Sequence, residues 1–100
     1  MSDRNPGYKR KDKNLIAGCL EIMASDLSEV DRVAKAFVLV TDALIRETEN
    51  EIELARAMGD QGNLVKDQIK RNVIEFVQGI FNDAYWRVIG RKVEDVREQS

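Results

Sequence analysis

The residues of this chain that could do chemistry are mainly carboxylates, because the sequence contains no histidine and only one cysteine. Glutamates alternate at Glu47, Glu49, Glu51 and Glu53 within a segment that has helical periodicity. Residues four apart share a helix face, so Glu47 lies beside Glu51, and Glu49 lies beside Glu53. Paired carboxylates of this kind can hold a divalent cation. A metal site is therefore the first chemical hypothesis that the sequence raises.

The acidic spacing is similar in part to that of helical nucleotide pyrophosphohydrolases of the MazG type. In that family, a Glu-x-x-Glu motif and a later Glu-x-x-Asp motif hold magnesium against a nucleotide phosphate. Here the nearest three-residue spacings join Glu47 to Asn50 and Asn50 to Glu53. The following helix offers Glu75 and Asp83 without the second motif. We therefore interpret the glutamates as a solvent-exposed acidic ridge. A MazG-like, metal-dependent nucleotide pyrophosphohydrolase is the least favoured of the three functions that we consider.

Catalysis of other kinds lacks its usual residues in this sequence. Helical di-iron sites require a Glu-x-x-His motif, and general acid–base chemistry near neutral pH most often uses histidine. Cys19 has no basic residue within one helical turn to activate it, so we interpret it as a small buried apolar side chain. We expect a non-enzymatic protein with no catalytic residue, no metal, no cofactor and no small-molecule substrate.

Basic residues form the second group with a recognisable use. They occupy the amino-terminal tail and both ends of the last predicted helix, where two clusters lie about 30 Å apart. Because that separation is close to one turn of a duplex, binding of double-stranded RNA or DNA through phosphate contacts is the alternative function. The candidate nucleic-acid contacts are Lys9, Arg10, Lys11, Lys66, Lys70, Arg71, Arg87, Arg91 and Lys92.

The elements that position these residues are predicted to be helices. Residues 1–11 are polar, hold the only proline and predict a flexible basic tail, whereas residues 12–98 predict a single all-helical domain. Apolar residues recur three and four positions apart in that domain. This spacing predicts helices over approximately 13–24, 28–58 and 63–97.

Capping signals mark the ends of the predicted helices. Asp26 and Ser28 each precede an acidic residue by three positions, and either one can start the second helix. Gly59 is suited to end that helix, because glycine adopts the left-handed conformation that helix ends require. Gly79 and Gly90 leave open whether the third helix is continuous.

The predicted helices differ greatly in length. The second and third helices would span about 45 and 50 Å, and the few residues between them force an antiparallel hairpin. The first helix would span about 18 Å, so it covers less than half of the hairpin's apolar seam. A second copy that packs by a two-fold axis would cover the remainder. The fold class is therefore all-α: a short N-terminal helix, then a long antiparallel helical hairpin that completes a helical bundle by homodimerisation.

The predicted interface lies on the last helix. Its aromatic and branched residues are the ones that commonly anchor a contact between proteins. A seam of this kind serves a second copy or a different protein, and the sequence leaves both open. The expected dimer or partner interface consists of Val73, Phe76, Ile80, Phe81, Tyr85, Trp86 and Ile89.

Composition sets the remaining expectations. The chain is 43% apolar and 34% charged, and it has no apolar run long enough to span a bilayer. Residues 1–13 are polar and basic without a signal-peptide pattern, so we expect a cytoplasmic protein. The favoured function is that of a small interaction or regulatory protein, of the kind found among phage and bacterial regulators. It would bind a protein partner through a dimeric helical scaffold.

Overall fold

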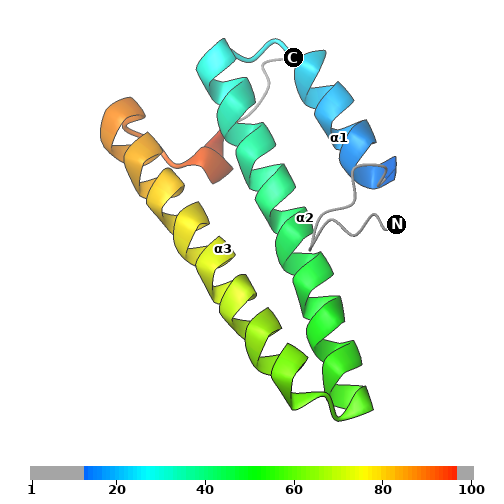
Figure 1. The fold of residues 1–100 in the computed structure, drawn as a ribbon. Helices are drawn as coiled ribbons and strands as arrows, with labels where there is room; N and C mark the ends of the chain where they lie inside the picture. The colour runs from blue at the N-terminus through cyan, green and yellow to red at the C-terminus, as the bar shows by residue number, and fades with distance from the viewer. Residues whose placement is uncertain (1–12, 97–100) are drawn as a thin grey trace.

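The computed structural model describes residues 13–96 and shows an all-helical hairpin. Its elements are α1 (Lys13–Met23), α2 (Glu29–Met58), α3 (Gln61–Ile89) and a short 3-10 helix, η1 (Val93–Asp95). Figure 1 shows α2 and α3 as two long antiparallel arms, with α1 along the other side of α2. The predicted all-α class and helical hairpin are confirmed, and the predicted basic tail over residues 1–11 lies outside the described residues.

The ends of α2 follow the capping chemistry of the sequence. Ser28 is the N-cap, and its hydroxyl oxygen accepts a hydrogen bond from the backbone N–H of Asp31 at 3.2 Å. Of the two predicted caps, Ser28 is thus the one used. Gly59 ends the helix with a φ of 69°, a left-handed conformation that favours glycine. Asp60 then caps α3 by accepting from the backbone N–H of Asn63 at 3.1 Å.

Small residues on α2 allow α3 to approach closely. Ala34, Thr41, Thr48 and Ala55 recur every seven positions, and none is more than 7% exposed. The two threonine hydroxyls donate to the backbone carbonyls four residues earlier, so these buried polar groups are satisfied within α2. A seven-residue repeat is typical of helices that pack along each other in a gentle left-handed supercoil.

The predicted range 63–97 for the third helix is wrong at its C-terminal end. The helix ends at Ile89, because Gly90 adopts a left-handed conformation with a φ of 87° and its N–H donates to the carbonyl of Trp86. The chain then folds back into η1. This reversal buries Val93 and Val96, which are 5% and 3% exposed.

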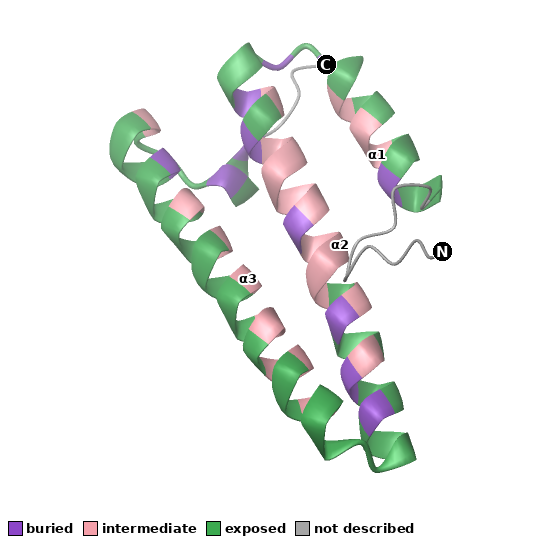
Figure 2. Cartoon of the chain, in the orientation of Figure 1, coloured by how far each residue is buried: buried purple, intermediate pink, exposed green. Residues whose placement is uncertain are grey.

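The apolar core lies at the end of the molecule away from the α2–α3 hinge. Leu27, Ala34, Tyr85, Val93 and Val96 form one buried cluster there. Figure 2 shows buried residues from the α1–α2 loop, α2, α3 and η1 at this end, whereas α3 is largely exposed along the rest of its length. This cluster therefore closes the hairpin arms at the end away from the hinge, whereas Ile52 and Ala55 of α2 are buried outside the cluster, toward the hinge.

The short helix α1 packs directly on α2. A Cβ at Gly18 would lie 2.7 Å from a terminal methyl carbon of Leu39, so a larger residue at this position would require the Leu39 side chain to move. Leu15 is buried, but Ile16, Leu20 and Met23 of the same helix are exposed. No helix within residues 13–96 combines the length and the apolar content needed to cross a membrane.

Candidate functional site

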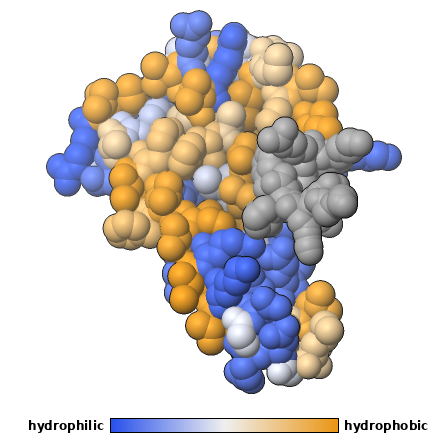
Figure 3. All heavy atoms as spheres, in the orientation of Figure 1, coloured by the Kyte–Doolittle hydropathy of each residue, from blue (hydrophilic) through white to orange (hydrophobic). Residues whose placement is uncertain are grey.

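One side of α3 carries a continuous row of exposed apolar side chains, here called the outer stripe. Its members are spaced four, four, three and four residues apart, so they share one helix face. Each is between 52% and 69% exposed. Figure 3 shows hydrophobic atoms that follow the outer edge of α3 toward the hinge, next to a hydrophilic area. The outer stripe consists of Val65, Ile69, Val73, Phe76 and Ile80.

The opposite side of α3, here called the inner face, contacts α2. Phe81 stacks on Phe37 of α2, with ring centroids 4.3 Å apart. Gln78 donates to Thr41 and Asp42 of α2 at 2.6 and 2.9 Å. Three of the seven positions on this face are polar, whereas the outer stripe has none. The inner face consists of Leu64, Asp67, Arg71, Ile74, Gln78, Phe81 and Tyr85.

The predicted interface is therefore divided between surfaces. Val73, Phe76 and Ile80 belong to the outer stripe and are exposed, as a contact surface requires. The others do not share that face. Phe81 and Ile89 pack against the buried core cluster, Tyr85 belongs to that cluster, and Trp86 is half exposed at the edge of a groove.

A polar clamp joins α2, α3 and the segment after α3. The hydroxyl of Tyr85 donates to one carboxylate oxygen of Asp31 at 2.5 Å, and the guanidinium of Arg91 donates to the other at 2.5 Å. Asp31 is only 8% exposed, so its charge depends on these two donors and on a further hydrogen bond with the Ser28 side chain. The clamp holds the chain just after Gly90 against the start of α2.

The clamp shifts the ionisation of its members. The hydrogen bond from Tyr85 is the main reason why the pKa of Asp31 is lowered, and the charge of Arg91 lowers it further against the opposing effect of burial. Burial is the main cause of the raised pKa of Tyr85, and the bond to the Asp31 carboxylate adds to it. Both shifts favour a carboxylate that accepts hydrogen bonds from a neutral tyrosine. We interpret this arrangement as structural.

Most basic residues predicted to contact nucleic acid within the described part of the chain are paired with carboxylates. Lys70 lies 2.9 Å from Glu51, and Arg71 lies 3.8 Å from Glu49, both across the α2–α3 seam. Arg87 pairs with an aspartate one turn earlier at 2.7 Å, and Arg91 belongs to the clamp. The rest of the predicted set comprises Lys66 and Lys92, which are exposed, and Lys9, Arg10 and Lys11, which lie outside the described residues.

The alternating glutamates of α2 take part in ion pairs rather than in one cluster. Glu49 and Glu51 pair with α3 as described, and Glu53 pairs with Arg56 at 3.1 Å. Within residues 13–96, no three carboxylate or cysteine side chains are close enough together to hold a metal ion. The Glu47–Glu53 segment therefore serves the hairpin, at least in part, by pairing with the basic residues of α3.

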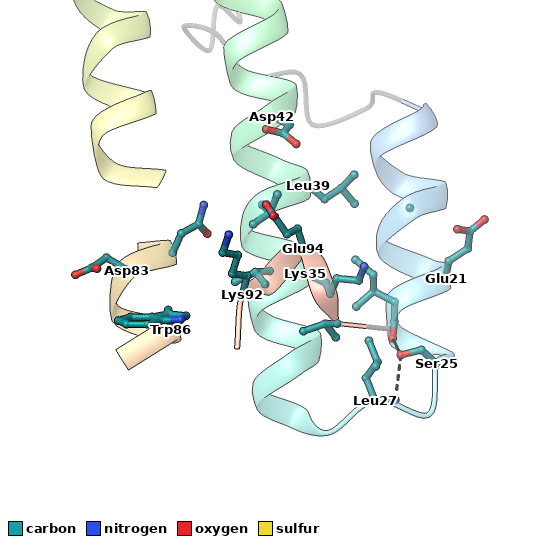
Figure 4. A pocket seen from close by; sticks show the side chains of 16 residues that line it. Glu21, Ser25, Leu27, Lys35, Leu39, Asp42, Asp83, Trp86, Lys92 and Glu94 are labelled. Atoms are coloured by element: carbon teal, nitrogen blue, oxygen red, sulfur yellow. Dashed lines mark hydrogen bonds between the residues drawn. The ribbon is translucent and has the colours of Figure 1, made fainter. Parts of the chain in front are cut away.

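A groove of about 840 Å³ lies between α1, α2, the end of α3 and η1. Figure 4 shows Leu27 and Leu39 within it, with Trp86 at its α3 side and Lys92 close to Glu94 in the same view. The Ser25 hydroxyl shapes the turn at one end, since it donates to the carbonyl of Ile22 at 2.6 Å. Both acidic and basic residues line the groove, so charge alone does not define a ligand for it.

Sequence reasoning did not find the clamp or the division of α3 into two faces. Asp31, the acidic residue three positions after Ser28, entered the prediction only as part of the helix start, and Arg91 only as a nucleic-acid contact. One signal for the second feature was present: the seven-residue repeat from Ala34 to Ala55 on α2 marks which side of that helix α3 approaches. A row with the same seven-residue spacing occurs on α3 at Leu64, Arg71, Gln78 and Tyr85. This row lies on the inner face and contains no residue of the outer stripe.

Comparison with known proteins does not add a function. No protein-family model, no curated protein and no solved structure matches this chain. The functional argument therefore depends on the surfaces of the molecule itself.

Proposed function

We propose that this protein is a non-enzymatic interaction protein of regulatory type, which works as a homodimer of helical hairpins and binds a protein partner. The observation that carries the proposal is the outer stripe. Its five apolar residues are all more than half exposed on a helix whose other face is already packed. Such a surface is stabilised when another protein removes it from water.

The balance of buried and exposed apolar residues supports this function. Among the described residues, eight hydrophobic side chains are buried, whereas fifteen large ones are exposed. Scattered exposed apolar residues are ordinary, but a continuous row along a helix marks an interaction site. Residues 13–96 of a single copy therefore leave a large apolar surface uncovered.

The ion pairs favour a protein partner over nucleic acid. A basic residue must be available to phosphate if it is to strengthen binding to a duplex. Lys70 and Arg71 instead face glutamates across the hairpin, and Arg91 holds Asp31. The glutamates of α2 add negative charge beside these basic residues, and this charge repels a phosphate backbone.

Affinity capture from a native lysate tests the function. The bait is the full chain, and the capture is repeated after nuclease treatment. We expect protein partners to remain after nuclease and to be lost with Val73→Glu, which places a charge in the outer stripe. Val88→Glu is the matched control, since Val88 is also an exposed valine of α3 but lies outside the stripe.

The outcomes of the capture separate the alternatives. If the captured partners disappear after nuclease treatment, the proposed function is wrong and the protein binds nucleic acid. Partners that are lost equally with both variants would show that the outer stripe has no special role. A loss with Trp86→Ala, but not with Val73→Glu, would move the partner site to the groove.

A further inference from the structure

We infer that the outer stripe is covered by the same stripe of a second copy, with the two α3 helices antiparallel and Val73 close to the two-fold axis. This inference rests on the proposed function, and it identifies a second copy of the chain as the molecule that covers the outer stripe. It differs from a general statement of dimerisation because it specifies the helix, the direction and the register.

The spacing of the stripe suits a two-fold interface. In such an interface the same patch of both copies must be complementary to itself. Reversing the stripe about Val73 brings Val65 opposite Ile80 of the partner, and Ile69 opposite Phe76 of the partner. In each pair, a residue from the N-terminal half of one stripe faces a residue from the C-terminal half of the other stripe. Every residue of the stripe then has an apolar neighbour in the second copy.

The charges of α3 favour the antiparallel direction. Lys70 and Arg71 pair with glutamates of α2, Asp67 lies beside Lys70, and Asp83 pairs with Arg87. Within residues 13–96, the charges of α3 outside these ion pairs are therefore Lys66 in the first half of the helix and Glu75 in the second. An antiparallel pair sets the positive half of one helix beside the negative half of the other, whereas a parallel pair sets like halves together. The antiparallel pair also places the positive N-terminal end of each helix dipole beside the negative C-terminal end of the other, which is favourable.

Gly79 is a second observation that points to a neighbouring helix. It lies within α3 beside Phe76 and Ile80, and it is not among the glycines of positive φ. A Cβ placed there meets no atom of residues 13–96 within 4 Å. Glycine inside a helix costs up to about 1 kcal/mol relative to alanine, and no contact within the described residues requires it. Close approach of a second helix next to the stripe explains why the side chain is missing.

Cysteine cross-linking tests the register directly. All variants carry Cys19→Ala, so that only the introduced thiols react with a short bis-maleimide cross-linker. Val73→Cys is expected to give a covalent homodimer as its main product. Val65→Cys and Ile80→Cys are expected to cross-link mainly with each other when the two proteins are mixed. Each should give about fivefold less product alone, because the two copies of residue 65 are then about 22 Å apart.

Val88→Cys is the matched control, since it is exposed on α3 outside the stripe. Strong self-cross-linking of both Val65→Cys and Ile80→Cys would overturn the antiparallel register in favour of a parallel one. Cross-linking at Val88→Cys but not at Val73→Cys would place the homodimer on another surface.

Light scattering on the same samples separates this inference from the proposed function. A chain that stays monomeric, yet still loses its protein partners with Val73→Glu, would overturn the second copy as occupant. The outer stripe would remain the partner site in that case. A monomer that keeps its partners with Val73→Glu would overturn both.

Discussion

The two faces of α3 differ in both apolar content and exposure: the less apolar face is packed, and the more apolar face is exposed. The inner face packs on α2 but includes Asp67, Arg71 and Gln78, whereas the outer stripe is wholly apolar and exposed. In a complete small domain, the more apolar face of a helix is the buried one. The difference supports the proposal that the outer stripe of α3 is covered by a second copy of the chain.

The inner face compensates for its polar residues with specific partners. Gln78 reaches two side chains of α2, and Lys70 beside this face reaches Glu51. The compensation is incomplete, because the Nε atom of Arg71 is buried and has no hydrogen-bond partner among residues 13–96. Such contacts fix the position of α3 more than they stabilise it. The outer stripe, in contrast, is more than half exposed within residues 13–96, so its burial by another protein would be favourable.

The largest expected difference between the faces comes from two phenylalanines of the same helix. Phe81→Ala removes the ring that stacks on Phe37 and Tyr85, and it should lower the free energy of unfolding by about 3 kcal/mol. Phe76→Ala removes a ring that is 69% exposed, and it should change the stability of the dilute chain by less than about 0.5 kcal/mol. Urea denaturation followed by circular dichroism at low protein concentration measures both.

When self-association is measured, Phe76→Ala should have a larger effect than Phe81→Ala. Phe76→Ala should weaken the dimer by about tenfold or more, as expected for an aromatic residue at an interface. Equal losses of stability from the two substitutions would show that Phe76 belongs to the core of one chain.

Tyr85→Phe should have the next largest effect, a loss of about 1 to 2 kcal/mol of unfolding free energy. The substitution keeps the ring but removes one hydrogen bond from the buried Asp31 carboxylate, which keeps Arg91 and the Ser28 side chain as partners. Chemical denaturation at pH 7 checks this value. A neutral result would mean that the carboxylate is satisfied without the tyrosine hydroxyl.

The effect of Tyr85→Phe should depend on pH in one direction. The pKa of Asp31 in the folded protein lies below its ordinary value of 3.8, so folding stability derived from this shift is present above that pH. It is lost as the pH falls further, through the lowered pKa. The stability gap between wild type and Tyr85→Phe should be constant from about pH 5 to 8 and should narrow below about pH 4. A gap that widens in acid would contradict the assignment.

Arg71→Met should have the smallest effect of the set. The arginine is 3.8 Å from Glu49, a partly exposed pair of low value, and its buried Nε lacks a partner. Replacement by methionine should leave stability within about 0.5 kcal/mol of wild type, or raise it. A loss of more than about 2 kcal/mol would show that the polar residues of the inner face stabilise the hairpin strongly.

The hairpin was predictable because its signals are local. A long proline-free stretch with apolar residues three and four apart predicts helices, and Gly59 together with the next few residues predicts the hinge. Ser28 likewise starts α2 with its own hydroxyl. Each of these features depends on residues within one or two turns of each other.

The features that were missed depend on contacts between distant parts of the chain. Tyr85 and Arg91 meet Asp31 across 54 and 60 residues of sequence. The range predicted for the third helix extended to residue 97, although the burial of Val93 and Val96 against the core favours a reversal at Gly90. Periodicity on α3 also failed to separate the two faces, because apolar residues occur on both sides of that helix.

The mass of the protein in solution, measured by light scattering over a range of concentrations, tests the central claim most directly. The wild-type chain should approach twice its mass of 11.4 kDa as concentration rises. Val73→Glu should stay at the mass of one chain with unchanged helix content, and Val88→Glu should behave as wild type. A wild-type protein that remains a single chain at every concentration would contradict the claim, as would a Val73→Glu variant that dimerises like wild type.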